Sequence, residues 1–455
     1  MPRNRSRLVS SFFALITFVF LLSACGGGGS SPATPPKTNY YSSATEIPMS
    51  GPDVPGVEIY DAAVRSLMIK WNVPGMTVAV VRNGKLIVAR GYGYAEYDAR
   101  EPMQPGSRMR ISSASKTFTA VAIIHLVEKG KLNFDDRFLD ILTQYQVPAN
   151  GDQRLRSVTI RNLLQHSGGW DRGKSGDPMG MSKQVVDALH VPAPATCSDT
   201  IRYMMSKPLD FNPGDHFVYS NFGYCILGRV VEKLTGMRYE DYVRSEILAG
   251  MDVHGMSTGR TLLSQRGPYE ARYYDYSGAP MYDSVMPGGG KVEGPYGAFS
   301  VEAADAHGSW VASSIDLTRF MTSIDGTRQK FWNPDMATAF TARPSLVTQD
   351  PTPAWNGTQN SDGWYGMGIF VQPDTQDMTW WHWGNSPGDD SIMLRNGRGW
   401  AWAALANTLP KDAVGFMNDL DALLWSAFNS GVQGSDTDLY EQFPSPDVPS
   451  SGVQN

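Results

Sequence analysis

Two Asn-Gly pairs near opposite ends of this 455-residue chain constrain its fold most strongly. Residues 76–97 hold two apolar runs joined by Asn83-Gly84, and residues 391–408 hold two more joined by Asn396-Gly397. Asn-Gly between such runs is typical of a two-residue hairpin turn, because both turn positions need a positive φ. Each end of the chain is therefore expected to supply a β-hairpin.

The chain between the hairpins has a different pattern. From roughly 117 to 300 it reads as helices and long loops, and the clearest helix is at 221–236. Further helices are expected at 57–73 and 412–430. These patterns predict an α/β fold, in which an antiparallel sheet flanked by helices is built from both chain ends and carries a mostly α-helical inserted domain. This unit is placed at residues 51–430.

The first 24 residues have the pattern of a lipoprotein signal peptide. Three arginines precede an apolar run at 8–22, which is too short to span a membrane comfortably. Leu-Ser-Ala-Cys follows and resembles the bacterial lipobox, in which the cysteine, here Cys25, is lipidated. An ordinary secretory signal and an uncleaved anchor are the alternatives. Residues 25–50 begin with Gly, Ser and Pro and are expected to form a flexible linker.

These features predict an exported lipoprotein, held to the membrane by a lipid anchor at Cys25 and facing the periplasm. Gly26 after the cysteine favours the outer membrane of a Gram-negative bacterium. Export places Cys197 and Cys225 in an oxidising compartment, where they have one possible pairing. A disulfide and a buried, unpaired Cys225 both stay open. Residues 431–455 are polar and acidic and are expected to be a disordered tail.

The composition excludes several classes of partner. Hydrophobic residues make up 41% of the chain, charged residues 18%, and the net charge is −6, which is typical of a globular protein. No run rich in Lys and Arg stands out, so no nucleic acid is expected. The seven histidines lack metal-ligand spacing, and the glycines at 288–290 before Lys291 lack the Ser or Thr of a phosphate loop. No metal, cofactor or protein partner is therefore expected.

Ser113 is the one serine in the chain with a lysine three residues later, Lys116. The pair stands where an apolar helical pattern begins, so the two side chains are expected on one helix face, one turn apart. A serine hydroxyl becomes a good nucleophile only when a base takes its proton. Lysine can be that base only if burial or a nearby cation lowers its pKa. The alternative is a solvated lysine at a helix start.

Two later motifs supply partners for this chemistry. Tyr219 and Asn221 lie just before the clearest helix. A tyrosine phenolate can relay a proton, and an asparagine amide can hold both a lysine and a substrate carbonyl. The alternative is that Ser220 or Asn221 only caps the helix while Tyr219 packs. His-Trp-Gly at 382–384 lies on an expected late strand, where the glycine lets a substrate approach the backbone.

The order of these motifs resembles that of the class C β-lactamase-like serine hydrolases. That family includes class C β-lactamases, DD-peptidases, D-aminopeptidases and family VIII carboxylesterases. Three further stretches of this chain are also similar to the family, namely 161–170, 211–236 and 310–321. The resemblance covers roughly residues 55–430. The resemblance implies a β-lactamase/penicillin-binding-protein-like fold with no metal or cofactor.

The resemblance also implies a role for each motif residue. Ser113 is expected to be the acylated nucleophile, and Lys116 and Tyr219 together the general base and acid. Asn221 is expected to position Lys116 and the substrate amide or ester. The expected catalysis therefore depends on four side chains from two motifs.

The late strand departs from the class C pattern. His382 takes the place of the lysine that faces the substrate carboxylate in class C β-lactamases, and a neutral imidazole does not hold a carboxylate as an ammonium does. The departure therefore weakens the β-lactamase reading. The oxyanion hole is expected beside Gly384, from the backbone N–H groups of Ser113 and Asn385. The tryptophans around His382 predict a flat apolar wall.

The leading interpretation is a serine hydrolase that acts on a small-molecule ester through an acyl-enzyme at Ser113. A peptidase acting on D-amino-acid or peptidoglycan-like amides is second, and a β-lactamase is third. A non-catalytic envelope binding protein is the alternative from another class.

Two similar motifs are set aside. Gly384–Gly388 matches a nucleophile elbow around Ser386, but Pro387 has no N–H for an oxyanion hole, and no histidine follows His382. A second His-x-Gly at 166–168 precedes the tyrosine motif and is interpreted as a structural loop.

Overall fold

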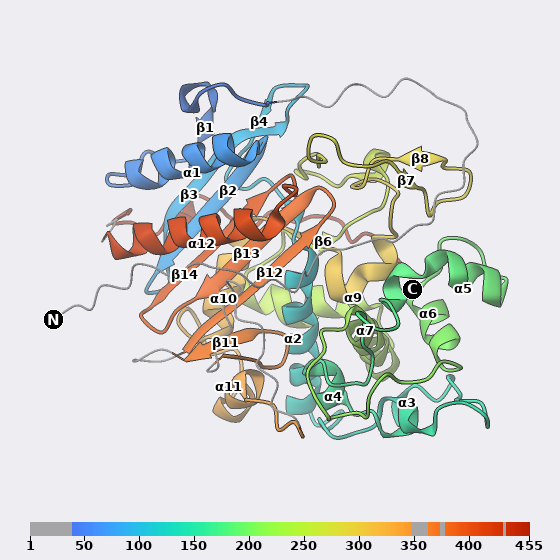
Figure 1. Cartoon of the computed structure of the whole chain (residues 1–455). Helices are drawn as coiled ribbons and strands as arrows, with labels where there is room; N and C mark the ends of the chain where they lie inside the picture. The colour runs from blue at the N-terminus through green and yellow to red at the C-terminus, as the bar shows by residue number, and fades with distance from the viewer. Residues whose placement is uncertain (1–38, 348–362, 374–377, 431–433) are drawn as a thin grey trace.

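The computed structural model describes residues 39–347, 363–373, 378–430 and 434–455. Its centre is a nine-stranded antiparallel sheet in the order β1-β3-β2-β14-β13-β12-β11-β10, with β4 beside β3 (Figure 1). The two ends of the chain meet where β2 pairs with β14, with Ala79 opposite Ala403. The expected sheet built from both chain ends is thereby confirmed. The strands are β1 (Met49–Ser50), β2 (Gly75–Arg82), β3 (Lys85–Glu96), β4 (Glu101–Pro102), β10 (Trp364–Tyr365), β11 (Phe370–Pro373), β12 (Met378–Ser386), β13 (Asp389–Arg395) and β14 (Trp400–Ala406).

The two expected hairpins are both present, but their turns differ. Asn83 and Gly84 have φ of 51° and 77° and join β2 to β3, as the sequence predicts. The turn between β13 and β14 is longer, and its positive φ belongs to Gly399 instead of Asn396-Gly397. The reason is that the Asn396 side chain accepts hydrogen bonds from the backbone N–H groups two and four residues later, which closes a wider loop.

Helices cover both faces of the large sheet. α1 (Glu58–Trp71) and α12 (Ala413–Asn429) pack together on one face, and α10 (Ser314–Ile324) contacts β2, β13 and β14 on the other (Figure 1). Side chains of β14 alternate between the two cores, as period-two strand geometry requires. Trp402 and Ala404 belong to the core with α1 and α12, whereas Ala403 and Leu405 belong to the core with α10.

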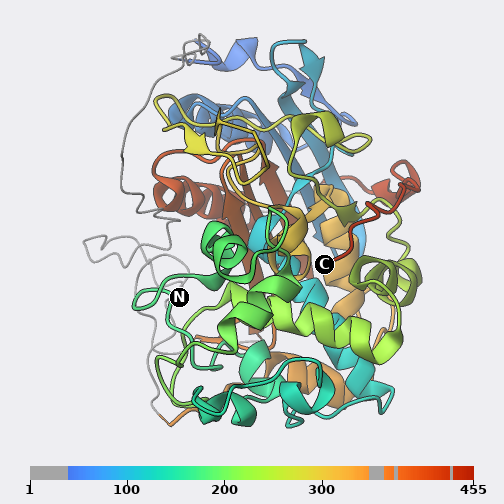
Figure 2. The same ribbon diagram turned by 90° about the vertical axis from the view of Figure 1, so that its right-hand side faces the viewer.

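The chain between the two groups of strands is mostly helical (Figure 2). It also contains a three-stranded sheet, β5-β9-β6, and a hairpin of β7 and β8. The sequence predicts only helices and loops here, because strands of two or three residues leave too short an alternation to detect. Within the described residues, no helix is long and apolar enough to cross a membrane. The elements are β5 (Met109–Arg110), α2 (Ser115–Glu128), α3 (Phe138–Ile141), α4 (Ile160–Leu164), α5 (Ser182–Leu189), α6 (Cys197–Met204), α7 (Asn221–Thr235), α8 (Tyr239–Tyr242), β6 (Ser257–Thr258), β7 (Tyr282–Asp283), β8 (Lys291–Val292), α9 (Asp305–Gly308), β9 (Trp310–Ala312) and α11 (Pro334–Thr341).

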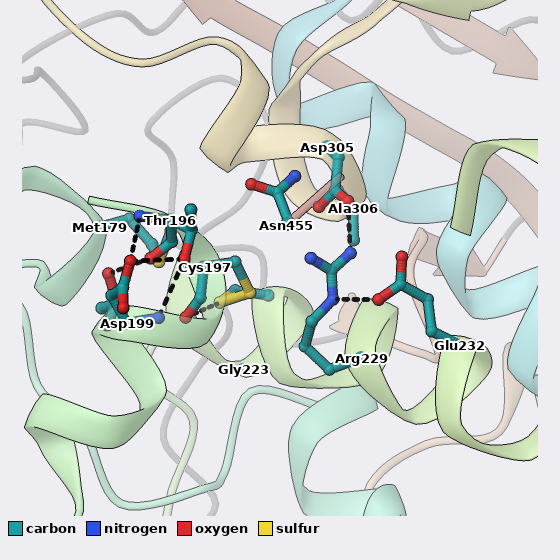
Figure 3. Close-up of a disulfide and its surroundings, with 12 residues drawn as sticks. Met179, Thr196, Cys197, Asp199, Gly223, Arg229, Glu232, Asp305, Ala306 and Asn455 are labelled. Atoms are coloured by element: carbon teal, nitrogen blue, oxygen red, sulfur yellow. Dashed lines mark hydrogen bonds and ion pairs between the residues drawn. A yellow bond between two sulfur atoms is a disulfide. The ribbon is translucent and has the colours of Figure 1, made fainter. Parts of the chain in front are cut away.

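Cys197 in α6 and Cys225 in α7 form a disulfide, with their Cα atoms 5.9 Å apart (Figure 3). Of the two alternatives that the sequence leaves open, the structure has the bridge. The cysteines are 28 residues apart. Closing a loop of that size removes conformations from the unfolded chain and stabilises the fold by about 3.6 kcal/mol in the chain-entropy account.

Residues 1–38, with the predicted signal peptide and Cys25, lie outside the described residues. Residues 39–50 are described, and the expectation of a flexible linker is wrong for them. Tyr41 is buried and donates a hydrogen bond to the carbonyl oxygen of Pro74, and β1 pairs with β3. A buried aromatic ring and a strand edge order this segment.

The C-terminal segment 434–455 packs on the molecule, so the expectation of a disordered tail is wrong for these residues (Figure 2). The Arg319 guanidinium of α10 donates to the carbonyl oxygens of Tyr440 and Phe443, at 3.2 and 2.5 Å. The Tyr440 hydroxyl donates to Thr318 Oγ1 at 2.9 Å. A polar composition favours solvation, but here Arg319 and Thr318 of α10 bond the start of the segment, and Glu240 and Arg244 bond Ser451 and Val448 farther along it.

Replacing Tyr440 by alanine tests this anchoring. The ring is 5% exposed, and the guanidinium groups of Arg319 and Arg328 lie over it. Tyr440→Ala should lower the free energy of unfolding by about 3–5 kcal/mol, the usual cost of removing a buried aromatic ring. Urea denaturation measures the change. Tyr269→Ala is the control, because that side chain is 68% exposed and its loss should cost less than about 0.5 kcal/mol. Equal midpoints for the two variants would contradict the anchoring.

Candidate active site

Ser113 lies in a single 3-10 turn, Ser112–Ala114, between β5 and the start of α2. Lys116 is in the first turn of α2, and its Nζ is 3.2 Å from Ser113 Oγ. Ser113 is half-buried, whereas Lys116 has no exposed surface. The alternative of a solvated lysine at a helix start is therefore excluded.

The amine of Lys116 is held by the neighbouring helix α9. It donates a hydrogen bond to the carbonyl oxygen of His307, with Nζ 2.7 Å from that oxygen. Burial lowers the pKa of Lys116 well below its ordinary value, the charge of Asp177 offsets part of this, and the charge of Arg172 adds to it. The site thus favours the neutral amine, which is the form that can accept the Ser113 proton.

Tyr219 stands just before α7, which is capped by the Ser220 side chain accepting from the Gly223 N–H. The Tyr219 ring centroid is 4.8 Å from Lys116 Nζ. Burial raises the pKa of Tyr219, and interaction with the Ser113 hydroxyl and the charge of Arg172 lower it again in part. Among the described residues its buried hydroxyl has no hydrogen bond of good geometry, so it is free to exchange a proton with a bound substrate.

Asn221 is the first residue of α7 and lines the same cleft, but its amide is committed elsewhere. Its Nδ2 donates to Asp177 Oδ2 at 2.6 Å, and Asp177 also caps a short turn by accepting from the Met179 N–H. No direct hydrogen bond from Asn221 to Lys116 occurs among the described contacts. The structure therefore does not show the expected positioning of Lys116 by Asn221. Asn221 instead holds Asp177, whose charge raises the Lys116 pKa in part.

The cleft at Ser113 has an empty volume, with the solvent at its mouth, of about 450 Å³. Gly384 lies directly against the nucleophile turn: a Cβ placed there would be 2.1 Å from the carbonyl oxygen of Ile111 and 2.6 Å from the Ser113 nitrogen. Only glycine fits this approach. Ser113 and Asn385, whose N–H groups are the expected oxyanion donors, both line the cleft. Its lining residues are Ser113, Arg172, Tyr219, Asn221, Phe370, Trp383, Gly384 and Asn385.

His382 is fully buried behind the cleft, which corrects the expectation that it faces the substrate. Successive side chains of a strand point to opposite faces, and Trp383, the next residue of β12, lines the cleft. The His382 Nδ1 donates to the carbonyl oxygen of Trp383 at 2.6 Å, so Nε2 accepts from the Tyr365 hydroxyl at 3.2 Å. Burial, with the charge of Lys116, lowers the pKa of His382 to about 3, so the imidazole is neutral.

His166, which the sequence analysis interprets as structural, contacts the tyrosine motif. Its Nδ1 accepts from the Ser220 N–H at 3.1 Å, and its ring centroid is 4.3 Å from that of Tyr219. This contact agrees with the interpretation of a loop that flanks the site. Arg172, Asp177 and the carbonyl of His307 carry no motif, and sequence reasoning missed them.

The nucleophile elbow suggested around Ser386 is not formed. Ser386 is buried and donates to Asp389, and the chain then continues into strand β13 instead of a helix. The glycines at 288–290 lie in the turn between β7 and β8. Within the part of the chain that the structure describes, no group of three or more His, Cys, Asp or Glu is arranged to hold a metal ion.

A family model described as Beta-lactamase matches residues 60–424, most of the chain. "Protein flp" of Staphylococcus aureus (strain N315) is 27% identical over 219 residues, which are 48% of this chain and 41% of that protein. A "Probable fimbrial assembly protein FimD, serogroup H1" of Dichelobacter nodosus is 32% identical over 169 residues, 36% of this chain and 40% of that protein. The chain spans about two fifths of the length of these curated relatives.

Solved structures share the fold. The D-amino acid amidase of Ochrobactrum anthropi SV3, complexed with L-phenylalanine amide, has a TM-score of 0.60 at 20% identity, over 82% of this chain and 99% of that one. EstCE1, a hydrolase with promiscuous acyltransferase activity, has a TM-score of 0.61 at 19% identity, over 81% and 98%. The octameric penicillin-binding protein homologue from Pyrococcus abyssi has a TM-score of 0.60 at 22% identity, over 81% and 77%. The expected fold is confirmed.

Replacing the three central side chains tests their roles. Ser113→Ala should abolish acyl transfer, and Lys116→Ala and Tyr219→Phe should each lower kcat/KM by a factor on the order of 100 or more, because each removes a proton-transfer partner. Steady-state kinetics measures the losses, and thermal unfolding checks the fold. Lys129→Ala, at the exposed end of α2, is the control and should leave kcat/KM unchanged. Full activity in Lys116→Ala would rule out the amine as the base.

Proposed function

Because this chain belongs to the beta-lactamase family of serine hydrolases, we propose that it hydrolyses small-molecule esters through an acyl-enzyme at Ser113. The observation that carries the proposal is the buried amine of Lys116, 3.2 Å from the Ser113 hydroxyl and with a pKa lowered by burial. A serine beside such an amine is an activated nucleophile. A D-amino-acid peptidase and a β-lactamase are the second and third candidates at the same site.

Acylation follows from the positions of the groups. The Lys116 amine takes the hydroxyl proton as Ser113 Oγ attacks the carbonyl carbon of the ester. The oxygen of the tetrahedral intermediate then carries a negative charge, which the backbone N–H groups of Ser113 and Asn385 stabilise. The Tyr219 hydroxyl gives its proton to the leaving alcohol and regains one from Lys116, which leaves the acyl group on Ser113.

Deacylation reverses the proton path. A water molecule gives a proton to the same pair of side chains, and its oxygen attacks the acyl carbon. The tetrahedral intermediate collapses, the Ser113 oxygen recovers a proton, and a carboxylic acid leaves. One ester and one water are consumed, and one acid and one alcohol are released.

The walls of the cleft favour an ester over a β-lactam. Phe370 and Trp383 present aromatic surface to the cleft, which suits an acyl or aryl group. His382 is neutral and buried, so it provides no fixed charge at the position where class C β-lactamases hold a carboxylate. An ester with an apolar acyl or alcohol group therefore fits the aromatic part of the cleft.

We also propose that the protein is an exported lipoprotein, anchored through Cys25 to the membrane and facing the periplasm, in the outer membrane of a Gram-negative bacterium. The signal-like first 24 residues support this location. The disulfide between Cys197 and Cys225 supports it independently, since structural disulfides persist in oxidising compartments.

Turnover of two substrates by the protein lacking residues 1–25 tests the function. A short-chain p-nitrophenyl ester should be hydrolysed in a Ser113-dependent way, with little turnover of a chromogenic cephalosporin. Absorbance assays on this protein and its Ser113→Ala variant measure both. Dominant cephalosporin turnover would place the β-lactamase first. No turnover but a stoichiometric penicillin adduct on Ser113 would favour the peptidase. The absence of both turnover and adduct would favour a binding protein.

Arg172 gives the cleft a positive charge that the sequence did not predict. It lines the cleft, and its guanidinium lies 5.3 Å from the centroid of the Tyr219 ring. Among the described residues, no carboxylate pairs with it. A half-buried guanidinium without a counter-charge favours a substrate that brings one, because a charge-assisted hydrogen bond contributes about 1.5–3 kcal/mol. We therefore propose a preference for esters that carry a carboxylate near the reacting carbonyl.

A pair of esters tests this preference. The p-nitrophenyl monoester of succinic acid carries a carboxylate, and p-nitrophenyl butyrate has a similar length without one. Arg172→Gln should lower the ratio of kcat/KM for the succinate monoester to kcat/KM for the butyrate ester by a factor on the order of 10. Lys174→Gln is the matched control, because this nearby exposed lysine does not line the cleft. An unchanged ratio in Arg172→Gln would refute the preference.

A further inference from the structure

The residue before the nucleophile has an unfavourable backbone conformation. Ser112 has a φ of 43°, in the left-handed region that residues other than glycine rarely adopt. Such strain persists only where the surroundings hold it, and it is frequent at functional sites. The contacts of Ser112 therefore show what fixes the turn that presents Ser113.

The Ser112 side chain belongs to a closed ring of three buried polar groups. Its Oγ is 2.5 Å from Asp389 Oδ1 and 2.8 Å from Ser386 Oγ, and Ser386 Oγ in turn donates to Asp389 Oδ2. All three side chains are at most 8% exposed. Ser386 and Asp389 flank the tight turn from β12 to β13, whose Gly388 has a φ of 89°. The ring thus joins the nucleophile turn to this β-turn.

The place of the ring in the chain gives it a mechanical consequence. Ser112 immediately precedes Ser113, and Ser386 immediately follows Asn385. Ser113 and Asn385 are the residues whose N–H groups are expected to stabilise the oxyanion. The ring therefore hydrogen-bonds Ser112, the neighbour of one oxyanion donor, to Ser386, the neighbour of the other. A third hydroxyl adds to the link, because Ser391 Oγ lies 2.9 Å from the carbonyl oxygen of Ile111 and 3.1 Å from that of Gly384.

We propose that Ser112, Ser386 and Asp389 are positioning residues that hold the two oxyanion donors at a fixed separation. This inference rests on the proposed function, because it assigns the ring to the transition state of acyl transfer at Ser113. None of the three residues is among those that line the cleft. Their contribution is made through the backbone of Ser113 and Asn385, where a displacement of about 1 Å can cost a factor on the order of 100 in rate.

The charge state of Asp389 is compatible with a closed ring. Burial raises its pKa to about 7, while the two serine hydroxyls and the charge of Arg110 lower it and the charge of Glu270 raises it. Asp390, beside it, is also buried, and its pKa is raised by burial and by the charge of Asp389. A protonated carboxyl supplies the third proton that three mutual contacts require, and a carboxylate accepts from both serines.

Two substitutions of Asp389 separate positioning from mere packing. Asparagine keeps the ring, because its amide donates to one serine and its oxygen accepts from the other. Leucine has a similar size and opens the ring. Asp389→Asn should retain kcat within a factor of about 3, whereas Asp389→Leu should lower kcat by a factor on the order of 10–100 with KM changed by less than about 2, since an oxyanion donor acts mainly in the transition state.

Ser112→Ala and Ser386→Ala should give the same kcat loss as Asp389→Leu, and a fluorophosphonate should still label Ser113 in both. Ser323→Ala is the matched control, a buried serine of α10 that should keep its kcat. Thermal unfolding is measured for every variant, and Ser112→Gly, which tolerates the positive φ, replaces Ser112→Ala if that variant does not fold.

The outcomes separate the two proposals. Turnover that persists in Ser113→Ala overturns the proposed function and this inference with it. Turnover that requires Ser113 but keeps its full kcat in Asp389→Leu overturns the inference alone. An equal kcat loss in Asp389→Asn and Asp389→Leu also overturns it, because the ring would then not be what matters. Loss in leucine with rescue in asparagine supports it.

Discussion

The exclusion of water from the Lys116 amine is the constraint on which the rest of the site depends. Burial is the largest cause that lowers the pKa of Lys116 toward that of a base, and this burial requires α7 and α9 to pack against α2. The Arg229 guanidinium of α7 pairs with Asp305 of α9, two residues before the carbonyl that receives the Lys116 hydrogen bond (Figure 3). A buried ion pair adds little net stability, but breaking one is costly, so it fixes how the two helices meet. The packing of these helices is therefore what lowers the pKa of Lys116 and allows it to act as the base.

The sheet supplies the opposite wall, and it can do so only because the two chain ends pair. β12 reaches the nucleophile turn through the register from β2 to β14, β13 and β12, so the position of Gly384 depends on three successive strand pairings. A side chain at Gly384 would overlap the carbonyl of Ile111, and the strand would have to move away from Ser113. A slip of one residue would turn Trp383 inward and His382 outward. The geometry of the oxyanion hole therefore depends on the correct register of the sheet.

The parts of this fold that were predictable from sequence are those with a local periodic signal. The hairpin at Asn83-Gly84, the helix at 221–236 and the Ser113–Lys116 spacing each express a period or turn that a short window contains. The packed segment 434–455 has no such signal, because its order comes from residues far away in the sequence, among them Arg319 and Glu240. The direction of His382 was also missed, although strand alternation with Trp383 contains it once the register is known. Arg172 and Asp177 lie in loops whose path depends on tertiary contacts, so no spacing rule finds them.

The three histidines around Lys116 explain why the proton of Ser113 has one destination. His166, His307 and His382 are all buried, and burial with the charge of Lys116 lowers the pKa of each. An imidazole with a depressed pKa holds a proton poorly. Within the part of the chain that the structure describes, none of the three histidines hydrogen-bonds the Ser113 hydroxyl, which lies 3.2 Å from the Lys116 amine. The nearby carboxylate, Asp177, accepts hydrogen bonds from the Asn221 amide and from the Met179 N–H. Each of these groups would compete for the proton if it were solvated or unpaired, so the same burial that makes Lys116 a base also removes its rivals.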